Sequence, residues 1–176
     1  MVVSSQGKKL WDSGKVKSDN SIAVAYEGTL TPDTEYTWTL QVWDNHGSAS
    51  KKATSKWQTG IRTNDWKAQW ITASETPVPT YFRKAENLSR NIRKATAYIT
   101  SHGIYEAFIN GKRVGNYELT PGWTTYLKRL QYQAYDVTSL LQKGKNMIAA
   151  TVSPGWYSGG MNTGDPKNRY KYGKDV

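Results

Sequence analysis

Hydrophobic and polar residues alternate along residues 35–42, where large apolar side chains occupy every second position. This period of two predicts a strand with one face on a core and the other face in water, with Tyr36, Trp38, Leu40 and Val42 on the core side. The sequence Asp44-Asn45-His46-Gly47 follows and predicts a hairpin turn, because Asn and Gly tolerate the positive φ that such turns need. A shorter apolar run, Ile22–Tyr26, predicts a further strand.

The second half of the chain contains short strand patterns separated by turn residues. Strands are predicted over residues 95–100, 127–135 and 147–152, and Tyr105, Ala107 and Ile109 share one face of another. Asn110-Gly111 is a strong hairpin signal, and Pro121-Gly122 predicts a second turn. Between Asp136 and Gly144, a capping residue at the start and a glycine at the end predict one helical turn, and a long Gly-rich loop is expected from Pro154. We therefore expect an all-β protein.

A change in character over residues 64–70 divides the chain into two domains, residues 1–63 and residues 64–176. We expect the second domain to begin with a strand that contains Trp66, Trp70 and Ile71. Eight Trp and twelve Tyr stand against two Phe, so most of the large rings carry a polar group. Such rings suit half-buried sheets and binding surfaces.

The formal net charge of +10 raises the question of nucleic-acid binding. The basic residues are scattered, however, and their densest groups are pairs such as Lys51-Lys52 and Lys128-Arg129. Nucleic-acid recognition normally requires a basic stripe or a known module, so a solvated basic surface is the better interpretation. Nucleic-acid binding is kept as the least favoured functional hypothesis.

Other classes are excluded more directly. The chain has no cysteine, which rules out disulfides, thiolate metal sites and a cysteine nucleophile. Residues 1–6 lack the pattern of a secretory leader, and no apolar run is long enough to cross a membrane, so we expect no membrane association. The compartment, cytoplasmic or exported, stays open.

The spacing L-x-P-x-T-x-Y over residues 30–36 resembles the fibronectin type III family, in which the tyrosine makes a hydrogen bond at a corner between strands. A complete domain of that kind has about a hundred residues. The resemblance therefore implies that residues 1–63 form a partial fibronectin type III-like sandwich whose first strands are missing.

An ordered set of motifs resembles the amino-terminal region of bacterial α-L-rhamnosidases. The motifs are LWDSGKV, DWKAQWI, INGKRVG, PGWTTY, YDVTSLL and PGWYSGG, and they extend over nearly the whole chain. The resemblance implies a fibronectin-like domain, then a jelly-roll sandwich, with an α/α barrel carrying the catalytic carboxylates further along. We expect residues 64–176 to be a jelly-roll, carbohydrate-binding-like domain that lacks its last strands, and the chain to end before the barrel.

This resemblance implies a non-catalytic accessory region of an inverting glycoside hydrolase, inactive by itself. Two carboxylate pairs could in principle be catalytic, Asp33 with Glu35 and Glu106 with Glu118, but paired carboxylates on strands are usually solvated surface. His46 and His102 both lie in turn sequences, which makes a Ser-His-Asp arrangement a poor alternative. No cofactor is expected to be required.

Sugar binding is the favoured function of the aromatic and Gly-rich segments. Aromatic rings stack on the apolar face of a pyranose, and planar polar side chains fix its hydroxyls. The candidates are Trp123, Trp156 and Tyr157 for stacking and Asn162 and Asp165 for hydrogen bonds. By resemblance to calcium-using rhamnose-binding modules, Asn162 and Asp165 could also hold calcium, since their oxygens suit that ion. The competing interpretation is that the tryptophans plug the end of the sandwich.

The expected partners are a rhamnose-containing glycan or glycoside and the remaining domains of the parent enzyme. The alternative is a free-standing, calcium-dependent sugar-binding module. Incomplete sandwiches leave strand edges and apolar side chains uncovered, so we also expect marginal stability or self-association through unpaired edges.

Overall fold

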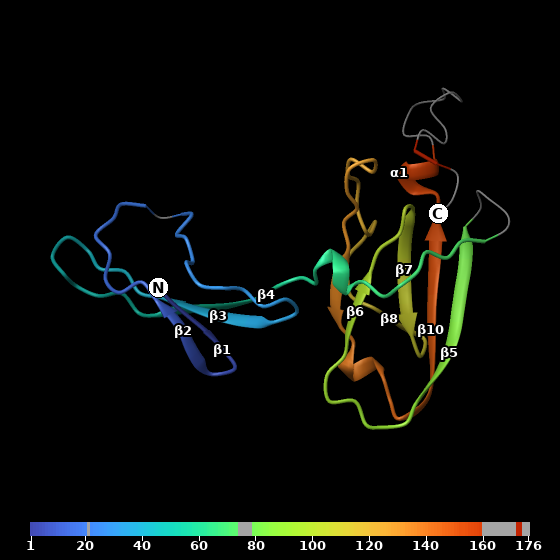
Figure 1. Ribbon diagram of the computed structural model, residues 1–176, viewed down its shortest axis with the longest axis horizontal. Helices are drawn as coiled ribbons and strands as arrows, with labels where there is room; N and C mark the ends of the chain where they lie inside the picture. Colours follow the sequence, from blue (N-terminus) through green and yellow to red (C-terminus); the bar gives the residue numbers. More distant parts are fainter. Residues whose placement is uncertain (21, 74–78, 160–171, 174–176) are drawn as a thin grey trace. The chain divides into compact units, whose positions relative to one another are not determined.

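The computed structural model describes residues 1–20, 22–73, 79–159 and 172–173. The chain folds into two compact units, Met1–Gln69 and Trp70–Val176. The regular elements are almost all antiparallel strands, which confirms the all-β class (Figure 1). No helix among the described residues has the length and apolar character needed to cross a membrane.

The first unit contains one four-stranded antiparallel sheet in the order β2-β1-β3-β4. Its strands are β1 (Val2–Ser5), β2 (Lys8–Asp12), β3 (Glu35–Leu40) and β4 (Ala53–Gln58). A short 3₁₀ turn, η1 (Thr63–Asp65), follows β4. The β3–β4 connection passes through the predicted turn, where the Asp44 carboxylate accepts hydrogen bonds from the backbone of His46 and Ser48 and Gly47 has a φ of 85°.

Tyr36 forms the corner that the spacing predicted. Its hydroxyl accepts a hydrogen bond from the backbone N–H of Thr31 at 2.7 Å. Its ring is buried and stacks on the cross-strand neighbour Trp57, with the ring centroids 4.6 Å apart. The tyrosine thus ties the loop before β3 to the sheet.

Three predicted strands are wrong in whole or in part. Residues 127–132 contain a turn, in which the backbone N–H groups of Lys128 and Arg129 donate to the Thr125 carbonyl, and a strand begins only at Gln133. Residues 22–26 form no strand, because the described part of this unit places no neighbouring strand beside them. Ile22 is therefore 80% exposed. Residues 66–73 are also irregular, and Trp70 instead uses its ring to stack on His102. The first strand of the second unit is β5 (Thr80–Leu88).

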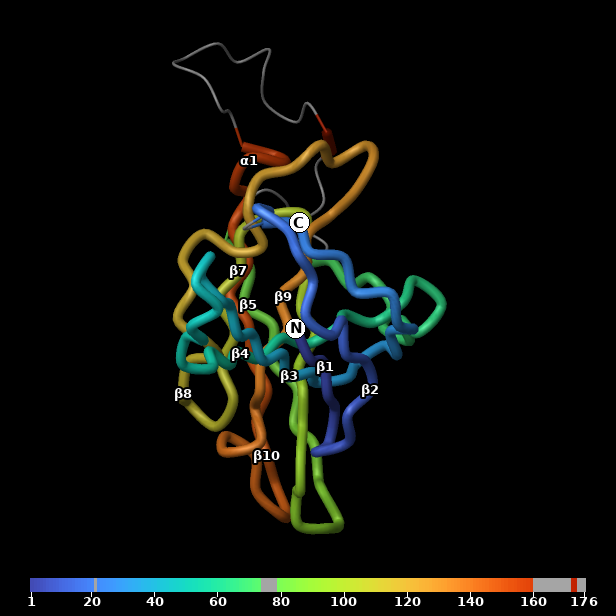
Figure 2. The backbone as a smooth tube through the Cα atoms, turned by 90° about the vertical axis from the view of Figure 1, so that its left-hand side faces the viewer, coloured from blue at the N-terminus to red at the C-terminus, as the bar shows by residue number. Residues whose placement is uncertain are grey.

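The second unit packs a four-stranded sheet, β5-β10-β7-β8, against a two-stranded sheet, β6-β9. The strands after β5 are β6 (Thr96–Ile99), β7 (Ile104–Ile109), β8 (Lys112–Arg113), β9 (Gln133–Asp136) and β10 (Gly144–Ser153). The long antiparallel course of β5 and β10 can be followed in Figure 2. The core between the sheets consists of Tyr105, Ala107, Ile109, Val114, Tyr135, Val137 and Val152.

The predicted turns of this unit are present. Asn110 and Gly111 both have positive φ, 52° and 79°, and join β7 to β8. The expected helical turn is the 3₁₀ helix η2 (Thr138–Leu140), which begins where the Asp136 carboxylate accepts a hydrogen bond from the Thr138 backbone.

The expected loop after Pro154 requires a correction. It begins with a short helix, α1 (Gly155–Ser158), whose first turn is closed by a bond from the Ser158 backbone N–H to the Pro154 carbonyl at 3.3 Å. Pro154 precedes this turn with a φ of −51°, and Gly155 has a φ of 52°, a value that glycine adopts without steric cost.

Candidate functional site

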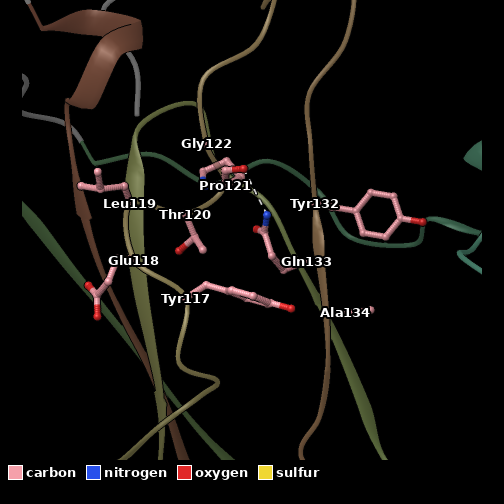
Figure 3. A pocket seen from close by; sticks show the side chains of 9 residues that line it. All are labelled: Tyr117, Glu118, Leu119, Thr120, Pro121, Gly122, Tyr132, Gln133 and Ala134. Carbon is pink, nitrogen blue, oxygen red and sulfur yellow. Dashed lines mark hydrogen bonds between the residues drawn. The ribbon is translucent and has the colours of Figure 1, made fainter. Parts of the chain in front are cut away.

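A shallow pocket of about 390 Å³ lies in the second unit between the segment after β8 and strand β9 (Figure 3). Its walls are Tyr117, Glu118, Leu119, Thr120, Pro121, Gly122, Tyr132, Gln133 and Ala134. In Figure 3 the side chains of Tyr117 and Gln133 lie between the two segments, whereas Tyr132 and Glu118 point away to either side. The volume is within the range of small-ligand sites.

The floor of the pocket is fixed by hydrogen bonds to Tyr105 on β7. Thr120 is buried; its carbonyl accepts from the Tyr105 backbone N–H and its hydroxyl donates to the Tyr105 carbonyl, each at 2.7 Å. The Gln133 amide donates to the Pro121 carbonyl at 3.1 Å and accepts from the Tyr105 hydroxyl at 2.8 Å. These contacts tie the Pro121-Gly122 turn to both sheets, so the pocket walls are held in place before any ligand arrives.

Trp123, the first sequence candidate, follows Gly122 directly and is 57% exposed. Tyr117, on the pocket wall, is 61% exposed. We call Trp123 together with the pocket residues the Trp123 rim. Exposed aromatic rings such as Trp123 and Tyr117 can stack on the apolar face of a sugar.

Trp156 and Tyr157 lie on α1 and are both half-buried. Tyr157 belongs to an aromatic stack, in which the ring of His102 lies between Trp70 and Tyr157 at centroid distances of 4.5 and 4.3 Å. Tyr126 meets the Tyr157 ring edge-on at 5.3 Å. One face of Tyr157 is therefore occupied by protein, which favours a packing role for this ring over a sugar platform.

Asn162 and Asp165, the other two candidates, lie outside the described residues. The calcium site expected from them stays a prediction. Elsewhere in the described chain, no three His, Asp or Glu side chains come together as metal ligands.

Arg113 lies between Glu106 and Glu118, one of the two carboxylate pairs of the sequence. Its guanidinium donates to both carboxylate oxygens of Glu118, at 2.8 and 3.1 Å, and to Glu106 at 3.0 Å. The hydrogen bond from Arg113 lowers the pKa of Glu118. A glycosidase acid needs a raised pKa, so this pair is suited to holding the Tyr117 loop rather than to catalysis.

The other carboxylate pair is also structural. Asp33 accepts a hydrogen bond from the Gln58 amide at 2.8 Å, and Glu35 forms an ion pair with Lys56 at 2.9 Å. Both interactions join neighbouring strands or their ends on an exposed surface. The histidines have other roles as well: His102 lies in the aromatic stack and His46 in the β3–β4 turn.

Most of the pocket wall lies outside the residues that sequence motifs indicate. Tyr117 and Gln133 are far apart in sequence and come together because Thr120 pairs with Tyr105 of β7 and Gln133 bonds to Pro121. One usable signal was the position of Tyr117, which lies between the two recognised motifs INGKRVG and PGWTTY.

Family profiles match both units of the chain. Residues 1–63 match the "Rha78A-like, N-terminal immunoglobulin domain", and residues 90–176 match the "Alpha-L-rhamnosidase N-terminal domain". The chain carries the amino-terminal domains of α-L-rhamnosidases. The immunoglobulin and fibronectin type III domains share a sandwich architecture, so the first match agrees with the tyrosine corner of this rhamnosidase region.

Individual α-L-rhamnosidases support the same assignment. One from Alteromonas sp. (strain LOR) is 35% identical over 164 residues, and one from Formosa agariphila is 36% identical over 165 residues; each alignment covers 85% of this chain and 18% of the relative. The crystal structure of native α-L-rhamnosidase from Aspergillus terreus superposes with a TM-score of 0.83 at 31% identity, covering 99% of this chain and 21% of that chain. The motif-based recognition is confirmed, and the chain spans 18% of the length of these curated relatives.

Proposed function

We propose that this region is a non-catalytic accessory part of an α-L-rhamnosidase, which provides scaffold and captures rhamnose-containing glycans at the Trp123 rim. The observations that carry the proposal are the exposed indole of Trp123, the residue that directly follows Gly122 of the pocket wall, and the partly aromatic lining of that pocket. The relatives are α-L-rhamnosidases, so a terminal rhamnose is the ligand that their activity suggests. The remaining domains of such an enzyme are the proposed partners.

The chemistry of rhamnose fits this rim. A deoxy sugar has an apolar face and a methyl group, which can cover an aromatic ring and so reduce the water-exposed apolar area of both. The hydroxyl of Tyr117, whose side chain lies between the two wall segments, can exchange hydrogen bonds with sugar hydroxyls. Because the pocket floor is already fixed through Tyr105, little ordering of the protein is needed on binding.

Titration calorimetry with L-rhamnose is expected to detect weak binding that depends on Trp123. Loss of one ring contact corresponds to roughly 0.5–1.5 kcal/mol, so Trp123→Ala should raise Kd by about two- to tenfold. Trp43→Ala removes an exposed indole from the first unit and is the matched control, which should bind as the wild type does. Binding that is lost in Trp156→Ala but kept in Trp123→Ala would move the site to α1.

The same titration tests the calcium proposal. Calcium and a chelator are compared on the wild type and on an Asn162→Ala, Asp165→Ala double variant. A calcium-dependent heat that disappears in the double variant would support the free-standing calcium-dependent module. Absence of heat with rhamnose under all of these conditions would remove the sugar-capture proposal.

The purified chain is expected to hydrolyse no α-L-rhamnoside. An aryl α-L-rhamnoside incubated with the purified chain should release no phenol above background, because Glu106 and Glu118 are both bound to Arg113 and the hydrogen bond from Arg113 lowers the pKa of Glu118. Colorimetric release over hours is the measurement. Enzyme-dependent release that disappears in Glu106→Gln or Glu118→Gln would contradict the accessory role.

A further inference from the structure

Strand β5 is the edge of the four-stranded sheet in the second unit. Within the described part of the chain it pairs only with β10, over the nine residues Thr80–Leu88 (Figure 1). It contains no proline, so its outer backbone groups can join a further strand. Because side chains alternate and Phe82 packs against the core, Phe82, Lys84, Glu86 and Leu88 share the inner face.

We infer that β5 is a self-complementary dimer edge, which pairs antiparallel with β5 of a second copy of this chain with Ala85 on the two-fold axis. The inference is independent of sugar binding. It extends the sheet of one copy into the sheet of the other through backbone hydrogen bonds.

Symmetry limits the registers that are available. A two-fold axis between two antiparallel edge strands must run perpendicular to the sheet, which keeps inner faces with inner faces. Opposite residues of an antiparallel pair point to the same side of the sheet. At the axis, a residue must therefore lie opposite the same residue of the second copy, and not opposite its sequence neighbour. Placing the axis at Arg83, Lys84 or Glu86 would set two like charges directly opposite each other, which is unfavourable.

The register centred on Ala85 instead pairs opposite charges twice. Lys84 of each copy lies opposite Glu86 of the other, and the small Ala85 side chains meet at the axis. Phe82 lies opposite Leu88 of the second copy, also twice. Both of these apolar residues are half-buried in the single chain, so pairing would remove further apolar area from water.

The single chain already holds the two charges in the required position. Lys84 and Glu86 form an ion pair at 2.6 Å along the strand, with side-chain exposures of 77% and 42%. In the dimer each ammonium would lie near a carboxylate of its own chain and one of the second copy. Charges on edge strands normally prevent association, but here their alternating sign makes the edge attractive to itself.

Charge-swap variants measured by sedimentation equilibrium test this register. The wild type should show a concentration-dependent dimer. Lys84→Glu and Glu86→Lys each place like charges opposite one another twice, and each should raise the dimer dissociation constant by roughly tenfold or more. Lys145→Glu, which changes an exposed charge on the neighbouring strand β10, is the control and should associate as the wild type does.

Two rescue experiments separate register from damage to the fold. An equimolar mixture of Lys84→Glu and Glu86→Lys restores both opposite-charge pairs and should form a mixed dimer, and the double variant carrying both swaps should dimerise by itself. Circular dichroism establishes that each variant is folded, and the double swap keeps the test valid if a single swap unfolds. A strictly monomeric wild type, association that ignores the swaps, or failure of both rescues would overturn the inference.

Discussion

Replacing Asn146 by aspartate is expected to lower the free energy of unfolding by roughly 2–4 kcal/mol, a large part of the stability of a typical domain. Asn146 is 2% exposed and uses both ends of its amide. Its Nδ2 donates to the carbonyls of Gln142 and Gly144 at 2.7 and 2.9 Å. A carboxylate of the same size cannot donate these bonds and would face two carbonyl oxygens in a buried site.

The other end of the Asn146 amide links two turns. Its Oδ1 accepts from the Gln142 backbone N–H and from Nδ2 of Asn110, both at 2.9 Å. Asn110 in turn accepts from the Met147 backbone N–H at 2.9 Å. The β7–β8 turn and the turn before β10 therefore hold one another, which explains why loss of one amide should affect the whole second unit.

Urea denaturation at pH 7 measures the effect, with Asn91→Asp as a matched control at an exposed position between β5 and β6. The control should change the unfolding free energy by less than about 0.5 kcal/mol. Burial without a cation raises the pKa of the carboxyl introduced by Asn146→Asp, so it should gain a proton as the pH falls and recover one donated bond. The deficit relative to the wild type should therefore shrink between pH 7 and pH 5, and a constant deficit would contradict this explanation.

The turns were predictable because their causes are local. The positive φ values of Asn110 and Gly111 follow from the residue types, and the tyrosine corner follows from a seven-residue spacing. The bond between Asn110 and Asn146 was not predictable, since the two residues are far apart in sequence and Asn110 already had a sufficient local explanation as a turn residue. Local rules identified the motifs but not the contact between them.

The failed predictions also have a non-local origin. The run Ile22–Tyr26 has the composition of a strand, but a strand requires a neighbour, and the described part of the first unit provides none there. Trp70 is also of a residue type that is common in strands, yet its ring stacks on the ring of His102 and its backbone joins no described strand. In both cases the partner decides the conformation.

Within the candidate site, Trp123 could be found because it lies next to an obvious turn. The pocket beside it depends on the buried Tyr105, whose hydroxyl and backbone position Gln133 and Thr120. Sequence patterns placed Tyr105 on the core face of its strand but could not show that its hydroxyl supports a surface pocket. That role depends on a long-range hydrogen bond.

Alkaline conditions should destabilise the second unit through this same Tyr105. The residue is 2% exposed, and its hydroxyl donates to Gln133 and lies 3.2 Å from the hydroxyl of Tyr135. Burial, and next the contact with Tyr135, strongly raise the pKa of Tyr105. In the unfolded chain the phenol loses its proton near pH 10, whereas in the folded chain it keeps the proton. Stability is therefore fully present below pH 10 and falls above it, by about 1.4 kcal/mol per pH unit from this group.

The comparison of wild type with Tyr105→Phe isolates the effect, because other alkaline titrations occur in both proteins. At pH 8 the variant should be less stable by roughly 1–2 kcal/mol, since the Gln133 amide loses its donor. Above pH 10 the variant lacks the Tyr105 contribution to the slope, so the two unfolding free energies should converge and cross near pH 11. Tyr81→Phe, on the exposed edge strand, leaves the Tyr105 hydroxyl in place and should keep the wild-type slope. Parallel curves for wild type and Tyr105→Phe from pH 8 to pH 12 would contradict this prediction. They would mean that the Tyr105 phenol ionises as easily in the folded chain as in the unfolded one.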